Sequence, residues 1–230
     1  PVRERPAEQV RTMVAEGLRR TGYDEVSLTS LSTADFSGIQ EVVTAAIADD
    51  ACGQVSVSLP SLRVDAFTVG IAAELQKARR TGLTFAPEAG TWRMRQVINK
   101  LISEEDLYSA VESAYSQGWR RGKLYFMTGL PTETDEDTLA ILELARKCIE
   151  VGRRHQPSPS VTVSVGGFVP KPFTPFQWFG QNTEDELRRK VGLLRDELKR
   201  QPKVYRGVQL KWHDARASVV EGMMSRGDRR

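Results

Sequence analysis

The 230-residue chain contains few of the residues that most often hold metals, with only two cysteines and two histidines. No CxxC, HxH or HExxH spacing occurs, so the sequence has no local zinc or iron–sulfur motif. Cys52 and Cys148 both fall in or beside expected helices, which is typical of buried packing thiols. This sparse cysteine usage predicts a reducing, cytoplasmic location.

Long apolar runs are also missing. The longest stretch, at 42–48, is far shorter than the roughly 20 residues that span a bilayer, so we expect no membrane partner. We see no secretory leader and no low-complexity segment. The first residue is Pro rather than Met, and we therefore expect a fragment of a longer protein. The remaining composition, 40% hydrophobic and 27% charged, is that of an ordinary globular protein with a sizeable core.

Cations are unevenly distributed along the chain, although its net charge is only +3. Residues 188–211 contain nine Lys or Arg against two acidic residues, a local charge of +7. We call this segment the basic stripe. Such a stripe is typical of a surface that contacts phosphates, and equally of the solvated face of a helix. Both interpretations stay open at this point.

Apolar periodicity alternates between strand spacing and helical spacing along the chain. Six short apolar strands are expected, at 26–31, 55–59, 83–86, 123–127, 161–165 and 208–212. Helical segments separate them, and their expected starts lie near Val10, Ile39, Asp65, Ser103, Thr134 and Thr183. This order predicts an α/β fold with a parallel sheet and right-handed crossovers. The sheet is either open and doubly wound or a complete or partial barrel.

The turns that follow the expected strands favour the barrel, because strand carboxyl ends converge on one mouth there. Glu88 follows a buried strand, where a carboxylate is costly unless it is used or paired. It suits the two hydroxyls of a ribose, and the alternative is a salt bridge to Arg93 or Arg95. Gly129 would let the backbone approach a ligand closely, although it also fits a plain turn.

Two further loop features have both a functional and a structural interpretation. Ser58 and Arg63 could bind a carboxylate, while an isolated loop Arg is most often solvated. Residues 169–178 contain three prolines and three aromatics, which is typical of a lid or a substrate wall at a barrel mouth. A barrel enzyme that works without a metal would need an acid–base pair, and Lys171 in this segment is the only candidate partner for Glu88.

Four long segments, at 82–100, 123–133, 163–178 and 211–230, together resemble the radical S-adenosylmethionine (SAM) superfamily. The likeness is greatest to an uncharacterised branch fused to a cobalamin domain, a relative of the methylthiotransferases. The resemblance covers nearly the whole chain, and its long segments are more specific than any single short motif.

The resemblance implies a partial (β/α) TIM-like barrel of about six βα units, with residues 1–180 as barrel core. Residues 181–230 would form a helix–strand–helix extension packed on it. The mouth would hold a 4Fe–4S cluster and SAM, and the cluster would reduce the sulfonium to release a 5′-deoxyadenosyl radical. The family also implies an electron donor such as flavodoxin or ferredoxin. Cobalamin in the full-length protein, and RNA or a ribosomal protein as substrate, are further expectations.

For the methionyl end of SAM, the resemblance assigns five residues. Ser30, Leu31 and Ser32 stand where the family has a Gly-Gly-Glu-like loop for the amino group. Ser58 and Arg63 would lie near the carboxylate.

For the nucleoside end, the resemblance assigns five more residues. Glu88 would lie near the ribose. Met127 and Gly129 match the motif beside adenine, with Val165 and Val169 as neighbours.

One departure from the family is decisive for activity. The CxxxCxxC loop is absent, and the resemblance begins just downstream of it, so the family's first strand and cluster loop are missing from the expected barrel. Cys52 and Cys148 cannot supply three thiolates, and we expect this chain alone to be inactive. Two alternatives remain: a nucleic-acid-binding module that uses the basic stripe, and a barrel lyase that works without a cluster.

Overall fold

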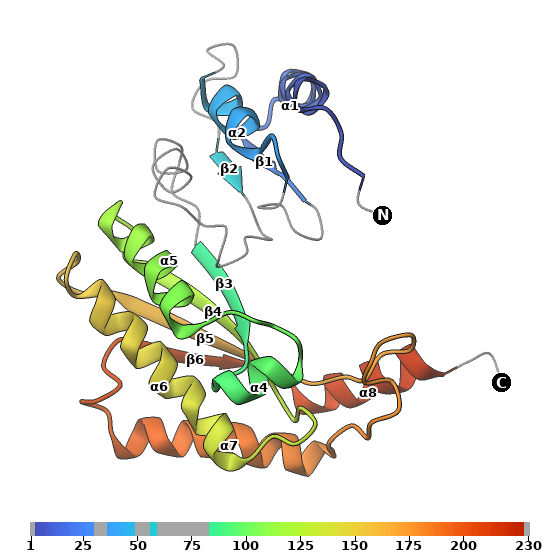
Figure 1. Cartoon of the computed structure of the whole chain (residues 1–230), viewed down its shortest axis with the longest axis vertical. Coiled ribbons are helices and arrows are strands. Elements are labelled where there is room, and N and C mark those ends of the chain that lie inside the picture. The colour runs from blue at the N-terminus through green and yellow to red at the C-terminus, as the bar shows by residue number, and fades with distance from the viewer. Residues whose placement is uncertain (1–2, 30–35, 49–55, 59–82, 228–230) are drawn as a thin grey trace.

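The computed structural model describes residues 3–29, 36–48, 56–58 and 83–227. An N-terminal group of elements lies beside a larger sheet (Figure 1). This group comprises α1 (Ala7–Thr21), β1 (Glu25–Ser27), α2 (Ile39–Ala48) and β2 (Ser56–Ser58). Strands β1 and β2 pair in parallel. The helix expected from Asp65 and the loop at 30–33 lie outside the described residues.

The larger sheet has four parallel strands, and their order in space is their order in the chain. They are β3 (Leu83–Glu88), β4 (Arg121–Thr128), β5 (Ser160–Gly167) and β6 (Val208–Trp212). The helices around them are α4 (Trp92–Val97), α5 (Glu104–Ser116), α6 (Asp135–Gly152), α7 (Glu184–Arg200) and α8 (Ala215–Arg226). Sequential parallel pairing without a switch point is typical of a barrel rather than a doubly wound sheet. The predicted fold class, an α/β partial barrel of βα units, is confirmed.

Helix starts follow directly from the sequence. The hydroxyls of Ser103 and Thr134 each accept a hydrogen bond from the backbone N–H three residues on. The carboxylates of Asp106 and Asp137 in turn accept hydrogen bonds from the backbone N–H groups of Ser103 and Thr134, which completes two capping boxes. Thr183 caps α7 in the same way, although Glu186 does not close its box. The short helix α4 was not predicted, because its six residues show no apolar period.

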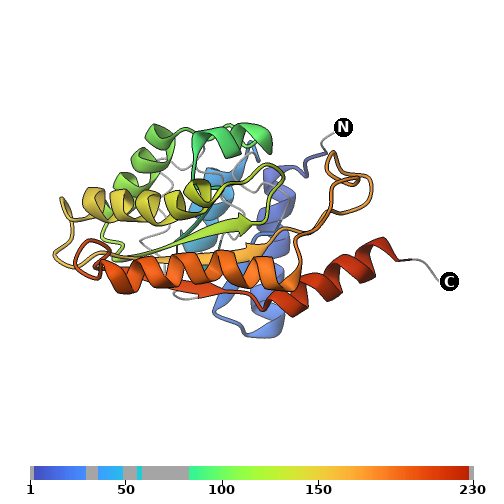
Figure 2. The same cartoon turned by 90° about the horizontal axis from the view of Figure 1, so that it is seen from below.

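One face of the sheet holds the main core. Leu124 and Phe126 of β4 lie in register with Val163 and Val165 of β5, and all four side chains are buried. They belong to one cluster with residues of α5 and α6, of which Ile141 is fully buried. Helices α5, α6 and α7 form the layer over this face (Figure 2).

The opposite face of the sheet is more polar, because successive side chains of a strand alternate between the two faces. Lys123 and Tyr125 share this face, and the Lys123 ammonium donates a hydrogen bond of 2.5 Å to the Tyr125 hydroxyl. Ser164 of β5 is in register with Tyr125 and is almost fully buried. A polar inner face is consistent with a barrel interior that receives a ligand rather than a sheet closed by a second core.

The turn after β3 is packed directly on α6. A Cβ added to Gly90 would lie 2.5 Å from the backbone nitrogen of Ile141 and 2.7 Å from the carbonyl oxygen of Asp137. We expect Gly90→Ala to destabilise the protein by about 1–3 kcal/mol, because the neighbouring helix backbone cannot give way. Thermal denaturation followed by circular dichroism measures this.

The matched control is Gly192→Ala in α7, where an added Cβ meets nothing within 4 Å. This substitution should stabilise the protein by roughly 0.5–1 kcal/mol through helix propensity. If Gly90→Ala were as stable as the wild type, the turn after β3 would not lie against α6.

Candidate functional site

The carboxyl ends of β3, β4 and β5 converge near α4 (Figure 1). A second buried apolar cluster lies at this end of the sheet, and we call it the mouth cluster. Its buried members come from the turn after each of these strands and from α4: Ala89, Met94, Leu130 and Phe168. Met127 and Phe176 pack against it. Phe176 belongs to residues 170–178, which we call the proline-rich segment, so three strand-end loops and this segment meet at one place.

Glu88 ends β3 in an unusual backbone conformation. Its φ is +70°, a value that non-glycine residues rarely adopt, and the register with β4 shifts between Phe85 and Glu88. Its side chain is 27% exposed, and burial raises the pKa of its carboxyl, while Lys100 at 3.7 Å opposes this shift. The predicted structural partners are wrong, since neither Arg93 nor Arg95 pairs with it. A strained, half-buried carboxylate at a strand end is characteristic of a ligand-contacting residue.

The buried side chain of Arg95 binds the same turn. Its guanidinium is 1% exposed and donates hydrogen bonds to the carbonyl oxygens of Ala89 (3.1 Å) and Gly90 (3.2 Å). Glu104 lies 4.0 Å away, and the Trp92 ring centroid lies 5.9 Å away. Burial lowers the Arg95 pKa, but a guanidinium stays charged at neutral pH. A buried cation thus fixes the path of the chain just after Glu88.

Asp137 ties this turn to the start of α6. Its carboxylate accepts a hydrogen bond of 2.6 Å from the Thr91 hydroxyl and pairs with Arg93. Burial alone would raise its pKa, but the hydrogen bonds from Thr91, Thr134 and Arg93 outweigh burial and hold the pKa at about 2. Its contribution to stability is therefore present above pH ~4 and is lost as the pH falls towards 2.

The turn after β4 is fixed by a buried ion pair. Gly129 has a φ of +81°, and an added Cβ would lie 3.0 Å from Asn182 and from Leu187. Its N–H donates a hydrogen bond of 2.6 Å to the Glu133 carboxylate, which also pairs with Lys190 of α7 at 3.0 Å. The side chains of Glu133 and Lys190 are only 3% and 5% exposed.

Sequence reasoning missed this pair. Lys190 belongs to the basic stripe by sequence, yet its side chain is buried. The helical spacing does indicate that Lys190 is buried, because it lies three residues after Leu187 and four before Leu194, on the apolar side of α7.

The three other residues predicted for the nucleoside end, Met127, Val165 and Val169, differ in where their side chains lie. Met127 packs against the mouth cluster, and Val169 is half-buried in the loop after β5. Val165 is 1% exposed, and its side chain lies in the main core on the helix-covered face.

Most residues predicted for the methionyl end lie outside the described residues, namely Ser30, Leu31, Ser32 and Arg63. Only the backbone of Ser58 is described, at the end of β2 opposite Ser27.

The proline-rich segment at 170–178 lies at the mouth end, as expected. Phe176 makes edge-to-face contacts with Phe168 and Phe179, at centroid distances of 6.0 Å and 5.4 Å. Phe173 and Trp178 are 98% and 85% exposed. The segment is thus anchored by one ring and presents two others to solvent.

The described residues do not fit an iron–sulfur cluster. They contain no group of three or more His, Cys, Asp or Glu side chains that could hold a metal. Cys148 is buried in the main core, where burial raises its pKa to about 12, so it is a thiol rather than a thiolate ligand. Cys52 lies outside the described residues. No helix in the described part of the chain is long and apolar enough to cross a membrane.

We predict that Lys190→Met destabilises the protein strongly at pH 7, by about 3–5 kcal/mol, because Glu133 is then left buried without its cation. Burial already raises the Glu133 pKa, and Lys190 opposes that shift. Without Lys190 the carboxyl should take up a proton more readily, so the loss should shrink as the pH falls towards 5. Urea denaturation at several pH values measures this.

The control is the double variant Lys190→Met with Glu133→Gln, which removes the charge on both sides. It should recover much of the lost stability at pH 7. A loss for Lys190→Met that is equal at pH 5 and pH 7 would contradict a buried ion pair.

The region that carries this site matches a known family. The family model for the radical SAM superfamily matches residues 1–145, more than half of the chain. An uncharacterized protein of Methanocaldococcus jannaschii is 30% identical over 228 residues, which cover 99% of this chain and 47% of that protein. The chain thus spans about half the length of this relative. With the parallel sheet and the site at its strand ends, the match shows that the chain belongs to the radical SAM superfamily.

Proposed function

We propose that this chain forms the barrel body of an enzyme that binds SAM at the carboxyl ends of β3, β4 and β5. One observation carries the proposal: Glu88 at the end of β3 and Gly129 directly after the neighbouring β4 both have positive φ, within the region that matches the family. Bound SAM would supply the radical chemistry, since one-electron reduction would break its C5′–S bond, release methionine and leave a 5′-deoxyadenosyl group that removes hydrogen from the substrate.

The residues of the chain would bind and shield SAM. The Glu88 carboxylate would accept hydrogen bonds from the ribose hydroxyls, in place of its long contact with Lys100. The backbone at Gly129 would lie against the adenine, because it has no side chain to keep the ring away. Met127 and Val169 would flank the ring, and Val165 would contribute through its backbone. The methionyl end would meet Ser30, Leu31, Ser32, Ser58 and Arg63.

The cluster ligands would come from a part of the whole protein outside this chain. The support is the cysteine count, since two cysteines cannot provide the three thiolates that such a cluster needs. The chain alone would then be inactive, and a small electron-transfer protein such as flavodoxin or ferredoxin would reduce the complete enzyme.

The proline-rich segment would act as a lip that keeps water from the reacting groups. Its anchor is Phe176 on Phe168, which leaves Phe173 and Trp178 free to cover a bound substrate. A stiff apolar edge suits an enzyme that must protect a reactive intermediate.

We also propose membership of the cobalamin-fused branch, with cobalamin in the full-length protein and RNA or a ribosomal protein as substrate. The support is the resemblance of the segments at 82–100 and 163–178. The division into residues 1–180 and 181–230 belongs to the same proposal. Because β6 pairs with β5 and α8 contacts β5, the second part would continue the sheet rather than form a separate body.

The lyase alternative has less support than the radical enzyme. It requires Glu88 and Lys171 to act together, but the Lys171 ammonium pairs with Glu221 of α8 at 2.6 Å. Glu88 has its own partner in Lys100.

We predict that Glu88→Gln weakens SAM binding by about tenfold to a hundredfold, the loss expected for one charge-assisted hydrogen bond. The melting temperature should stay close to that of the wild type. Isothermal titration calorimetry on the full-length protein, prepared without oxygen, measures the affinity.

Lys100→Met is the matched control, since it removes the other half of the same ion pair. It should leave SAM affinity unchanged or higher. If both variants lowered the melting temperature equally and Glu88→Gln kept full affinity, Glu88 would be a structural residue and the proposed ribose contact would be wrong.

A further inference from the structure

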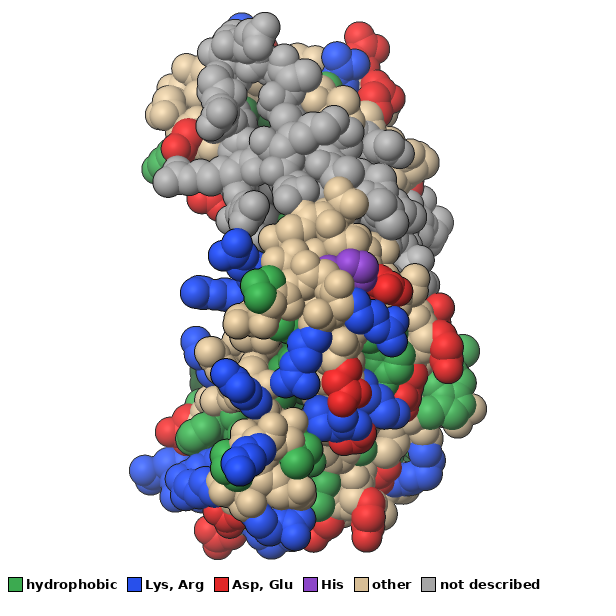
Figure 3. Space-filling view, turned by 90° about the vertical axis from the view of Figure 1, so that its left-hand side faces the viewer, with side chains coloured by type: hydrophobic (Ala, Val, Ile, Leu, Met, Phe, Trp, Pro, Cys, Tyr) green, Lys and Arg blue, Asp and Glu red, His purple; other side chains and the backbone are tan. Residues whose placement is uncertain are grey.

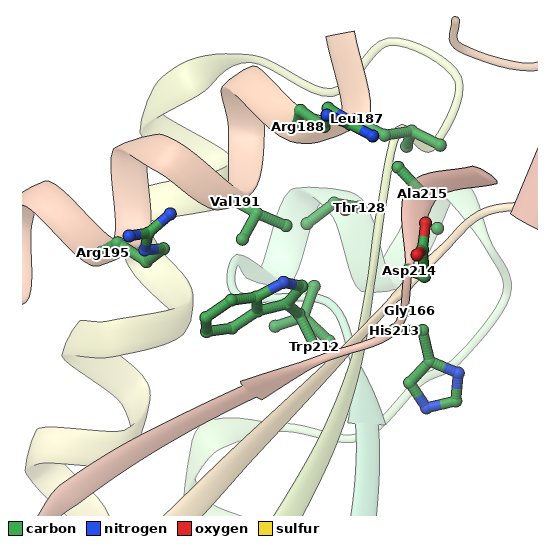
Figure 4. Close-up of a pocket in the computed structure, with 12 residues that line it drawn as sticks. Thr128, Gly166, Leu187, Arg188, Val191, Arg195, Trp212, His213, Asp214 and Ala215 are labelled. Carbon is green, nitrogen blue, oxygen red and sulfur yellow. The ribbon is translucent and has the colours of Figure 1, made fainter. Parts of the chain in front are cut away.

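A pocket of about 470 Å³ lies between α7 and the ends of β5 and β6 (Figure 4). It contains no residue of the mouth cluster. Trp212 is in register with Val165, whose side chain faces the helix layer, so the indole also faces α7. The pocket is thus on the outer, helix-covered side of the sheet. It shares the strand end at 165–167 with the proposed SAM site, whereas Glu88, Met127 and Gly129 do not line it.

Trp212 is the central feature of this pocket. Its side chain is 47% exposed although it faces a helix, and the Arg195 guanidinium lies 5.4 Å from the ring centroid. Figure 4 shows both residues in the pocket, with Val191 on the same helix nearby. A half-exposed indole beside a guanidinium offers a flat surface on which a planar base can stack.

Cations continue from the pocket along α7. Arg188 and Arg195 both line it, and Lys199 follows four residues later on the same helical face. Beyond the end of α7, Lys203 and Arg206 are exposed in the turn that leads to β6. Figure 3 views the side of the molecule where β4–β6 begin, and Lys and Arg side chains gather over its lower part.

Ion pairing divides the basic stripe into two sets. Four of its cations are paired with carboxylates: Arg188, Arg189, Lys190 and Arg200. No carboxylate in the described part of the chain forms a salt bridge with the other five: Arg195, Lys199, Lys203, Arg206 and Lys211. Of the two arginines that line the pocket, Arg195 is therefore the one without a carboxylate partner in the described part of the chain.

The acidic groups near the pocket do not oppose an anion strongly. Asp214 caps α8 by accepting a hydrogen bond of 2.8 Å from the Arg216 backbone, and it is the one carboxylate among the residues that line the pocket, against the two cations Arg188 and Arg195. Glu184 pairs with Arg188 at 2.5 Å, but the Arg188 side chain is exposed and that of Glu184 is 36% exposed. Exposed pairs of this kind contribute little and are readily exchanged for another anion.

We propose that this surface binds single-stranded nucleic acid, with one base stacked on Trp212 and phosphates along Arg188, Arg195 and Lys199. Cations alone would suit an acidic protein equally well. The Trp212 indole favours nucleic acid as the ligand, because bases present a flat π face that acidic side chains lack. This inference deepens the proposed function by naming a class of substrate or partner. Only the idea that the bound strand is the enzyme's substrate rests on that function.

Fluorescence anisotropy of labelled oligouridine RNA and oligothymidine DNA, about ten nucleotides long, tests the proposal without any cofactor. We expect Trp212→Ala to weaken binding about tenfold, whereas Trp212→Phe, which keeps an aromatic face, should stay close to the wild type. Trp92→Ala is the matched control, since it removes another partly exposed indole beside an arginine. It should not change the affinity.

The salt dependence tests the phosphate contacts. The logarithm of the affinity should fall linearly with the logarithm of the salt concentration, and Arg195→Ala should reduce that slope by about 0.7. Arg19→Ala, an exposed arginine on α1, should leave the slope unchanged. The ratio of the affinity for RNA to the affinity for DNA shows which of the two nucleic acids the surface prefers.

Two results would overturn the inference. One is the absence of binding to either oligonucleotide at low salt in a protein that melts like the wild type. The other is binding that Trp212→Ala does not alter and that a polyglutamate peptide competes away with equal strength, which would assign the surface to an acidic protein. Because SAM plays no part in these measurements, neither result bears on the Glu88 site.

Discussion

Parallel pairing of β3, β4, β5 and β6 in chain order is the constraint on which the rest of the molecule depends. Between parallel strands a crossover returns the chain to the end of the sheet where the strands begin. The turns that follow the strands therefore all lie at the opposite end, where the strands finish. The helices of these crossovers cover one face of the sheet and leave the other face polar. Glu88 and Gly129 are brought together by this topology, although 40 residues separate them in the sequence.

Buried charge fixes the turns that topology brings together. Arg95 binds the carbonyl oxygens just after Glu88, and Asp137 joins the same turn to α6. Glu133 and Lys190 hold the turn after β4 against α7. Charges of this kind are costly to bury. Asp137 and the Glu133–Lys190 pair are compensated by partners from other elements, whereas Nε and Nη2 of Arg95 have no hydrogen-bond partner in the described part of the chain. The strained backbone at Glu88 can persist because its surroundings leave the turn no freedom to relax.

Local signals were sufficient to predict most of the fold. Period-two apolar runs located the six strands of the described residues, and Ser103 and Thr134 marked helix starts because capping depends only on neighbouring residues. The candidate site was predictable where the ligand-facing residue follows a strand directly, as at Glu88 and Gly129. The partners of these residues were not, since Lys100 and Lys190 are recruited from other elements. The basic stripe shows the same limit, because a charge count cannot distinguish the buried Lys190 from Arg195 beside Trp212.

The central claim is that SAM binds where β3, β4 and β5 end. Hydrogen–deuterium exchange of the full-length protein, with and without SAM, tests it most directly. We predict slower exchange at 88–91, 127–133 and 166–169 when SAM is bound, and no change at 199–206. Protection confined to other segments, or no protection in these three while SAM is bound, would contradict it.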